Sequence, residues 1–82
     1  MDHRIAVIAI VVSEPETVEQ LNAILHSYAA YTVGRMGLPM RERKISLISL
    51  ALDAPQDIIS ALAGKLGRLP GVSAKTVYAP EV

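Results

Sequence analysis

Cysteine, tryptophan and phenylalanine are absent from the 82 residues of this chain. Without cysteine the protein has no disulfide scaffold, no thiolate metal site and no thiol nucleophile. Only three residues are aromatic, all of them tyrosine, although 51% of the chain is hydrophobic. We therefore expect a core built from Ile, Leu, Val and Ala.

The chain also lacks an excess of either charge, because eight basic and eight acidic side chains cancel. Proteins that bind nucleic acid through its phosphates carry clustered positive charge on one face. Direct binding to nucleic acid is therefore not expected. At this length the chain forms a single domain, residues 1–82, which buries only about 60–65% of its unfolded surface. A lone copy is expected to have a small margin of stability.

Long hydrophobic runs are missing as well. The longest, Ile5 to Val12, is far shorter than the ~20 residues that span a bilayer. The polar stretch Ser13-Glu14-Pro15-Glu16 follows it at once, without the small-residue cleavage pattern of a secretory signal peptide. We expect a cytoplasmic protein that has no contact with a membrane.

Short apolar runs bounded by polar residues, glycine or proline predict four strands. The first is rich in β-branched residues, and the second is interrupted by Gly34 and Gly37. The predicted strands are Ile5–Val12, Ala30–Leu38, Ile45–Leu52 and Val72–Tyr78.

Two helices are predicted between these strands, each after a capping signal. Ser13-Glu14-Pro15-Glu16 has the S-x-x-E form of a capping box, in which Ser13 and Glu16 each accept a backbone N–H of the other. Asp53-Ala54-Pro55-Gln56 repeats the pattern with Asp53 as the cap. Apolar residues then recur at helical spacing. They are Val18, Leu21, Ile24, Leu25 and Tyr28 in the first helix, and Ile58, Ile59, Leu62, Leu66 and Leu69 in the second.

The two halves of the chain match at an offset of 40 residues, so that Ile8 aligns with Ile48 and Pro15 with Pro55. A strand, a helix and a strand, repeated once, give the order βαββαβ. This order predicts the α+β ferredoxin-like sandwich, a four-stranded antiparallel sheet with both helices on one face.

The sheet face opposite the helices should be polar in a monomer, but the strands are apolar on both sides. One side of the first and third strands carries Ile5, Val7, Ala9, Val11, Ile45, Leu47 and Ala51, and the other carries Ala6, Ile8, Ile10, Val12, Ile48, Leu50 and Leu52. An exposed apolar face of several hundred Å² usually marks an interface. We therefore expect a homo-oligomer, a dimer or a tetramer, that buries this face or extends the sheet edge to edge.

The most unusual local feature is Gly34-Arg35-Met36-Gly37-Leu38-Pro39. Glycines inside a strand mark a bulge or a place where a ligand or another backbone comes close. Arg35, between them, has a planar donor fork that suits a carboxylate or a phosphate. The alternative interpretation is a twisted hairpin whose arginine is solvated.

Signals for catalysis or metal binding are weak. His3 and His26 have no second histidine or acidic residue at the spacing of a metal site. No serine can be paired with a base, so neither catalytic residues nor a cofactor are expected. An acylphosphatase-like hydrolase, with the same fold and size, is the enzymatic alternative. In acylphosphatases the corresponding first loop is glycine-rich and contains an arginine, which is not the case here.

Together with Arg41-Glu42-Arg43 and the segment from Leu62 to Val72, the glycine-bearing strand makes the chain resemble a known family over residues 4–78. It is similar to the small, stand-alone iron-only hydrogenase system regulators. The resemblance implies an ACT-like fold, related to the regulatory domain of nickel-responsive repressors, and a homo-oligomer. Those repressors hold nickel with several histidines and a cysteine, but Ala30–Asp53 contains neither, so nickel is not expected. With no DNA-binding arm, regulation would depend on a protein partner.

The same resemblance implies a site. ACT-type domains bind small molecules, often amino acids, between subunits, near the loop after the first strand and the glycine-bearing second strand. The corresponding positions here are Val12, Ser13, Gly34, Arg35, Met36 and Gly37. The leading expectation is a sensor of an amino acid or other anion, with Arg35 and the glycine backbone as binding groups. The alternative is a structural protein that docks on a redox or hydrogenase-maturation partner.

Overall fold

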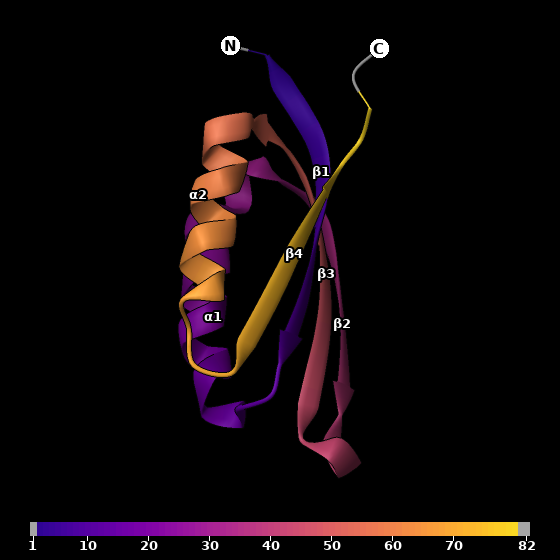
Figure 1. Ribbon diagram of the computed structural model, residues 1–82, viewed down its shortest axis with the longest axis vertical. Coiled ribbons are helices and arrows are strands. Elements are labelled where there is room, and N and C mark those ends of the chain that lie inside the picture. Colours follow the sequence, from indigo (N-terminus) through magenta and orange to yellow (C-terminus); the bar gives the residue numbers. More distant parts are fainter. Residues whose placement is uncertain (1, 81–82) are drawn as a thin grey trace.

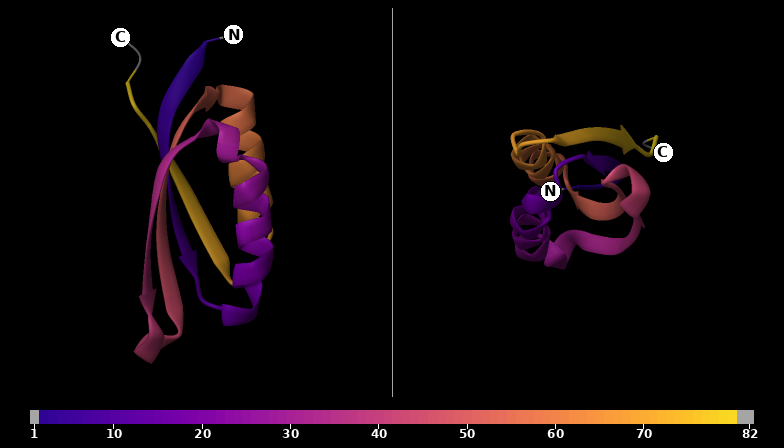
Figure 2. Two further views of the ribbon diagram at one scale, coloured as in Figure 1. Left: turned by 180° about the vertical axis from the view of Figure 1, so that it is seen from behind. Right: turned by 90° about the horizontal axis from the view of Figure 1, so that it is seen from below.

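A computed structural model describes residues 2–80 of the chain. Four antiparallel strands form one sheet in the order β2-β3-β1-β4, and two helices cover one of its faces (Figure 1). The views in Figure 2 place both helices on the same side of the sheet. The predicted α+β ferredoxin-like βαββαβ fold is confirmed. Its elements are β1 (His3–Val12), α1 (Val18–Ser27), β2 (Thr32–Met40), β3 (Ile45–Pro55), α2 (Gln56–Gly67) and β4 (Val72–Tyr78).

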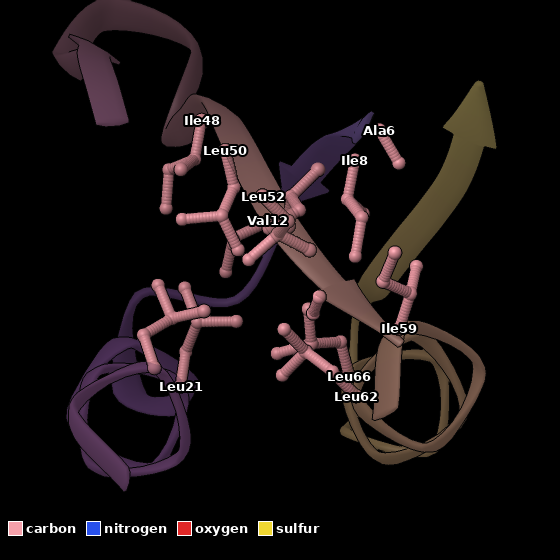
Figure 3. Close-up of a cluster of buried hydrophobic side chains, with 13 residues drawn as sticks. Ala6, Ile8, Val12, Leu21, Ile48, Leu50, Leu52, Ile59, Leu62 and Leu66 are labelled. Carbon is pink, nitrogen blue, oxygen red and sulfur yellow. The ribbon is translucent and has the colours of Figure 1, made fainter. Parts of the chain in front are cut away.

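The core lies between the helices and the sheet and is aliphatic, as the composition predicts. Side chains of β1 alternate, so that every second one is buried against the helices. Figure 3 shows these side chains meeting leucines and isoleucines that point inward from β3, α1 and α2. The buried cluster comprises Ala6, Ile8, Ile10, Val12, Leu21, Leu25, Ile48, Leu50, Leu52, Ala54, Ile59, Leu62 and Leu66.

The predicted capping box at Ser13 is wrong. Pro15–Thr17 form a 3₁₀ turn (η1), and α1 begins only at Val18, with no side-chain cap at Thr17. The Ser13 hydroxyl instead donates to the carbonyl oxygen of Gly71 at 3.1 Å, and the Ser13 N–H donates to the same oxygen at 2.8 Å. Because a tertiary partner takes its hydroxyl, Ser13 fixes the loop after β1 to the start of β4.

Asp53 is not a helix cap either. β1 begins at His3, which pairs with Pro55, so the ladder carries β3 through Asp53 to its end at Pro55. α2 then begins at Gln56 with Pro55 at the cap position and no side-chain cap. The Asp53 carboxylate lies 2.9 Å from Nδ1 of His3. Because β3 continues through Asp53 in its pairing with β1, Asp53 does not cap a helix, and α2 begins only after Pro55.

The connections at either end of β2 also shift its bounds. Ala29–Tyr31 form a 3₁₀ turn (η2), so β2 starts at Thr32 and not at Ala30, and it continues to Met40. A further 3₁₀ turn, η3 (Arg41–Arg43), closes the β2–β3 hairpin. Among residues 2–80, no helix has the length and apolar character to cross a bilayer.

Candidate functional site

The sheet face away from the helices is largely apolar. Pairing in register places Val7 of β1 between Ala51 of β3 and Val77 of β4, and Leu38 of β2 beside Leu47 of β3. Several of these side chains are exposed, including Met36 at 71%, Val77 at 67% and Leu38 at 59%. This surface, the open sheet face, comprises Ile5, Val7, Ala9, Val11, Met36, Leu38, Leu47, Ala51 and Val77. The expected two-sided apolar character of the strands is confirmed.

The open sheet face is hollowed on its β2 side. The depression has a volume of about 310 Å³ and lies over β1, β2 and β3. Ser49 is the one polar residue among those that line it. The lining residues are Ala9, Ile10, Val11, Met36, Leu38, Leu47, Ile48 and Ser49.

Arg35 lies on the other side of the sheet. A bulge between Thr32 and Gly34 sets the register of β2, and beyond it Arg35 pairs with the buried Leu50. The guanidinium therefore projects toward α1, where Nη2 donates to Oδ1 of Asn22 at 3.2 Å. No carboxylate of residues 2–80 forms an ion pair with it.

A groove runs between α1 and the uncovered inner side of β2. On one side of the Arg35–Asn22 pair it widens to a hollow of about 560 Å³, lined by Asn22, Ala23, Leu25, His26, Ala29, Thr32, Arg35 and Leu50. A second hollow of about 210 Å³ shares Arg35 and Asn22 and extends to Gly37 and Pro39. A Cβ added at Gly37 would meet no atom within 4 Å, so Gly37 borders open space at this end of the groove. We call the larger hollow the α1–β2 groove.

The predicted site residues form two groups within one subunit. Val12 is buried and Ser13 contacts Gly71 near β4, at one end of the sheet. Val12 pairs with Ser46, whereas Gly34 pairs with Ala51 and, through it, lies level with Val7. Gly34 therefore lies about 16 Å from Val12 along the strands. Gly37 pairs with Ile48 and is thereby level with Ile10, so it lies about 7 Å from Val12 in the same direction. The width of β3 separates both glycines from Val12.

Within the second group the side chains alternate. Gly34 and Met36 pair with Ala51 and Ser49 on the open sheet face, whereas Arg35 and Gly37 lie on the helix side. Asn22 was not expected from the sequence, and His26 was considered only as a metal ligand. The sequence signal that could have identified this pair is their spacing of one helical turn on the polar side of α1.

His3 and Asp53 form a separate polar pair near the far end of the sheet. Both side chains are about half exposed, at 51% and 48%. In the part of the chain that the structure describes, no three His, Asp or Glu side chains gather in the manner of a metal site.

Comparison with known proteins identifies the family. A family model described as "TM1266-like: Iron-only hydrogenase system regulator, putative" matches residues 4–76. The chain belongs to this family. The structure of the uncharacterized protein TM1266 from Thermotoga maritima superposes with a TM-score of 0.92 at 36% sequence identity, over 96% of this chain and 100% of that chain. The resemblance inferred from the sequence motifs is thereby confirmed.

A more distant structure shares the fold alone. The C-terminal domain of the MgtC protein from Mycobacterium tuberculosis superposes with a TM-score of 0.74 at 12% identity, over 94% of this chain and 88% of that one. The search of curated proteins found no match. The family is described as one of regulators.

Proposed function

We propose that this protein is a cytoplasmic, non-catalytic regulatory module of the ACT-like kind that works as a homo-oligomer in iron-only hydrogenase systems and senses a small ligand, an amino acid or another anion. The open sheet face is the observation that carries this proposal. The family description supports the regulatory setting.

The occupant that fits the open sheet face best is a second copy of the chain. Its central strand presents Ile5, Val7 and Val11 to solvent, with exposed fractions of 50%, 40% and 38%. Covering such apolar area contributes about 25 cal/mol per Å². The chain has a formal net charge of zero, so two copies have no net repulsion to overcome. A two-fold axis pairs the same patch of each copy, so the apolar side chains of one open sheet face would meet those of the other.

Assembly also supports the sensing part of the proposal. Val12 and Ser13 lie apart from Gly34 and Arg35 within one subunit. A site that uses both groups would therefore form only between subunits. Ligand binding would then stabilise the oligomer, because it would engage the assembled state alone. Arg35→Ala should abolish binding at such a site, and unchanged affinity would reject the role of Arg35.

The second candidate function is a docking protein, and the hairpin tip favours it. A hollow of about 470 Å³ at the β2–β3 turn is lined by Leu38, Pro39, Met40, Arg41, Glu42 and Arg43. Its apolar floor and two arginines suit an acidic segment of a redox or maturation partner.

The decisive experiment is native mass spectrometry of the full chain at micromolar concentration, with Val7→Glu as the test variant. We expect the wild type to be a dimer or tetramer and Val7→Glu to be a monomer, because an unpaired carboxylate would be buried in the interface. Gln20→Glu adds the same charge on an exposed side of α1 and should leave the assembly intact. A wild-type monomer would refute the proposal, and a retained small mass would favour the sensor over the docking protein.

A further inference from the structure

Arg35 has hydrogen-bonding capacity that the fold does not use. Its guanidinium presents several N–H donors in one plane. Within residues 2–80 a single one of them, on Nη2, donates, to Asn22 Oδ1 at 3.2 Å. That contact holds the charged group against α1, at the edge of the α1–β2 groove. Among the described residues no carboxylate neutralises it. A positioned guanidinium with a free edge is the group that binds a carboxylate through two parallel hydrogen bonds.

The rest of the α1–β2 groove is apolar at its floor. Leu25 and Leu50 are buried beneath it, at 4% and 1% exposure, and Ala23 and Ala29 line its sides with small side chains. The volume of about 560 Å³ lies within the range of small-molecule sites. An aliphatic chain can lie on these residues while its anionic end meets Arg35.

The remaining polar groups favour an anion over a zwitterion. His26 follows Asn22 by one helical turn and can donate an N–H in either protonation form. The Thr32 hydroxyl donates to the carbonyl oxygen of Tyr28 at 3.2 Å, so its proton is already used. None of the described residues that line the groove is Asp or Glu. An α-ammonium group would have no charged partner there and would lie close to the Arg35 guanidinium, which repels it.

From these contacts we propose that the α1–β2 groove binds a small monocarboxylate with an aliphatic body and no ammonium group, such as a branched 2-oxo acid, and that Arg35 anchors its carboxylate. This inference rests on the proposed sensing function, for which it names the ligand class. It places the site within one subunit, on residues that a subunit interface need not complete. Asn22 is a positioning residue that holds the guanidinium until the ligand arrives.

The test is calorimetric titration of the ¹⁵N-labelled full chain, with amide spectra recorded in parallel. The probes are 4-methyl-2-oxopentanoate and 3-methylbutanoate, compared with neutral 3-methylbutanamide and zwitterionic L-leucine. We expect saturable binding of both carboxylates, tighter than about 1 mM. The amide and L-leucine should each bind at least about tenfold more weakly. The amide has no negative charge to pair with Arg35, and L-leucine has an ammonium group that Arg35 repels. Amide shifts should concentrate at Asn22–His26, Thr32 and Arg35.

Two variants and two matched controls assign the effect to the groove. Arg35→Gln removes the anchor, and Asn22→Asp gives Arg35 an internal carboxylate of the same shape, so each should weaken binding by about tenfold or more. Arg68→Gln removes the same charge at the end of α2, and Gln20→Glu adds the same charge elsewhere on α1. Both controls should bind like the wild type.

Three results would overturn the proposal: no saturable binding of either carboxylate, equal or tighter binding of L-leucine, or equal losses in Arg35→Gln and Arg68→Gln. These results are separate from the fate of the proposed function. A carboxylate-binding monomer would refute the oligomeric module and retain the groove site. An oligomer that binds L-leucine through Ser13 would retain the module and refute the groove site.

Discussion

Thr17 is the buried polar side chain of the described core, with 2% of its surface exposed. Its hydroxyl donates to the carbonyl oxygen of Pro70 at 2.9 Å, and its N–H donates to the carbonyl oxygen of Glu14 at 3.0 Å. With Ser13 on Gly71, it connects the loop after β1 to the turn between α2 and β4. Two hydroxyls thus join segments more than fifty residues apart, as the separations of 53 and 58 residues show.

Replacing Thr17 with Val should therefore destabilise the protein. The side chain keeps its shape, but a part-buried hydrogen bond is lost and the Pro70 carbonyl loses its donor, which costs about 1–3 kcal/mol. Ser27→Ala removes a hydroxyl that bonds Ile24 on the exposed side of α1, and it should cost well under about 1 kcal/mol. Urea unfolding of both variants measures the difference. Equal losses would show that the Thr17 bond contributes no more than a surface contact.

At the scale of the elements, alternation and helical spacing predicted most of the fold. Alternation placed Ala6, Ile8, Ile10 and Val12 on one face of β1, because residues two apart in a strand face the same side. Since both faces of the strand are apolar, only the structure shows that this face meets the helices. Local signals failed where a tertiary partner competed with them. Ser13 and Asp53 have the residue types of caps, but the Ser13 hydroxyl donates to Gly71 and the Asp53 carboxylate lies beside His3. No local pattern records those partners. Asn22 was missed for the same reason, since its role depends on the strand that lies beside it.

The turn that ends α2 offers a matched pair of glycines. Gly71 has φ +70°, and a Cβ there would come within 2.7 Å of the Glu14 side chain. Gly67 ends α2, and a Cβ added there would meet no atom within 4 Å. We expect Gly71→Ala to destabilise the protein by about 1 kcal/mol or more, and Gly67→Ala to stabilise it by roughly 0.5 kcal/mol. Thermal unfolding of the two variants, each against the wild type, tests the opposite signs. A neutral Gly71→Ala would mean that the loop at Glu14 gives way without cost.

At the scale of the whole molecule, the two helices cover one face of the sheet and leave the other face exposed. The core is built by a chain of 82 residues. A chain of this length buries a smaller share of its surface than a longer one, so a lone copy is expected to have a small margin of stability. The open sheet face adds apolar surface that only another molecule can cover. Folding and assembly are therefore expected to be linked, with each copy contributing part of the other's stability.

If folding and assembly are linked in this way, the Tm depends on protein concentration. For a dimer, tenfold dilution lowers the free energy of assembly by about 1.4 kcal/mol, shared between two chains. The Tm of the wild type should fall on the order of 4 °C for each such dilution. Val7→Glu, which we expect to remain a monomer, should unfold at a lower Tm that is the same at every concentration, whereas Gln20→Glu should follow the wild type. A wild-type Tm that does not change with dilution would separate folding from assembly and leave the open sheet face without a role in stability.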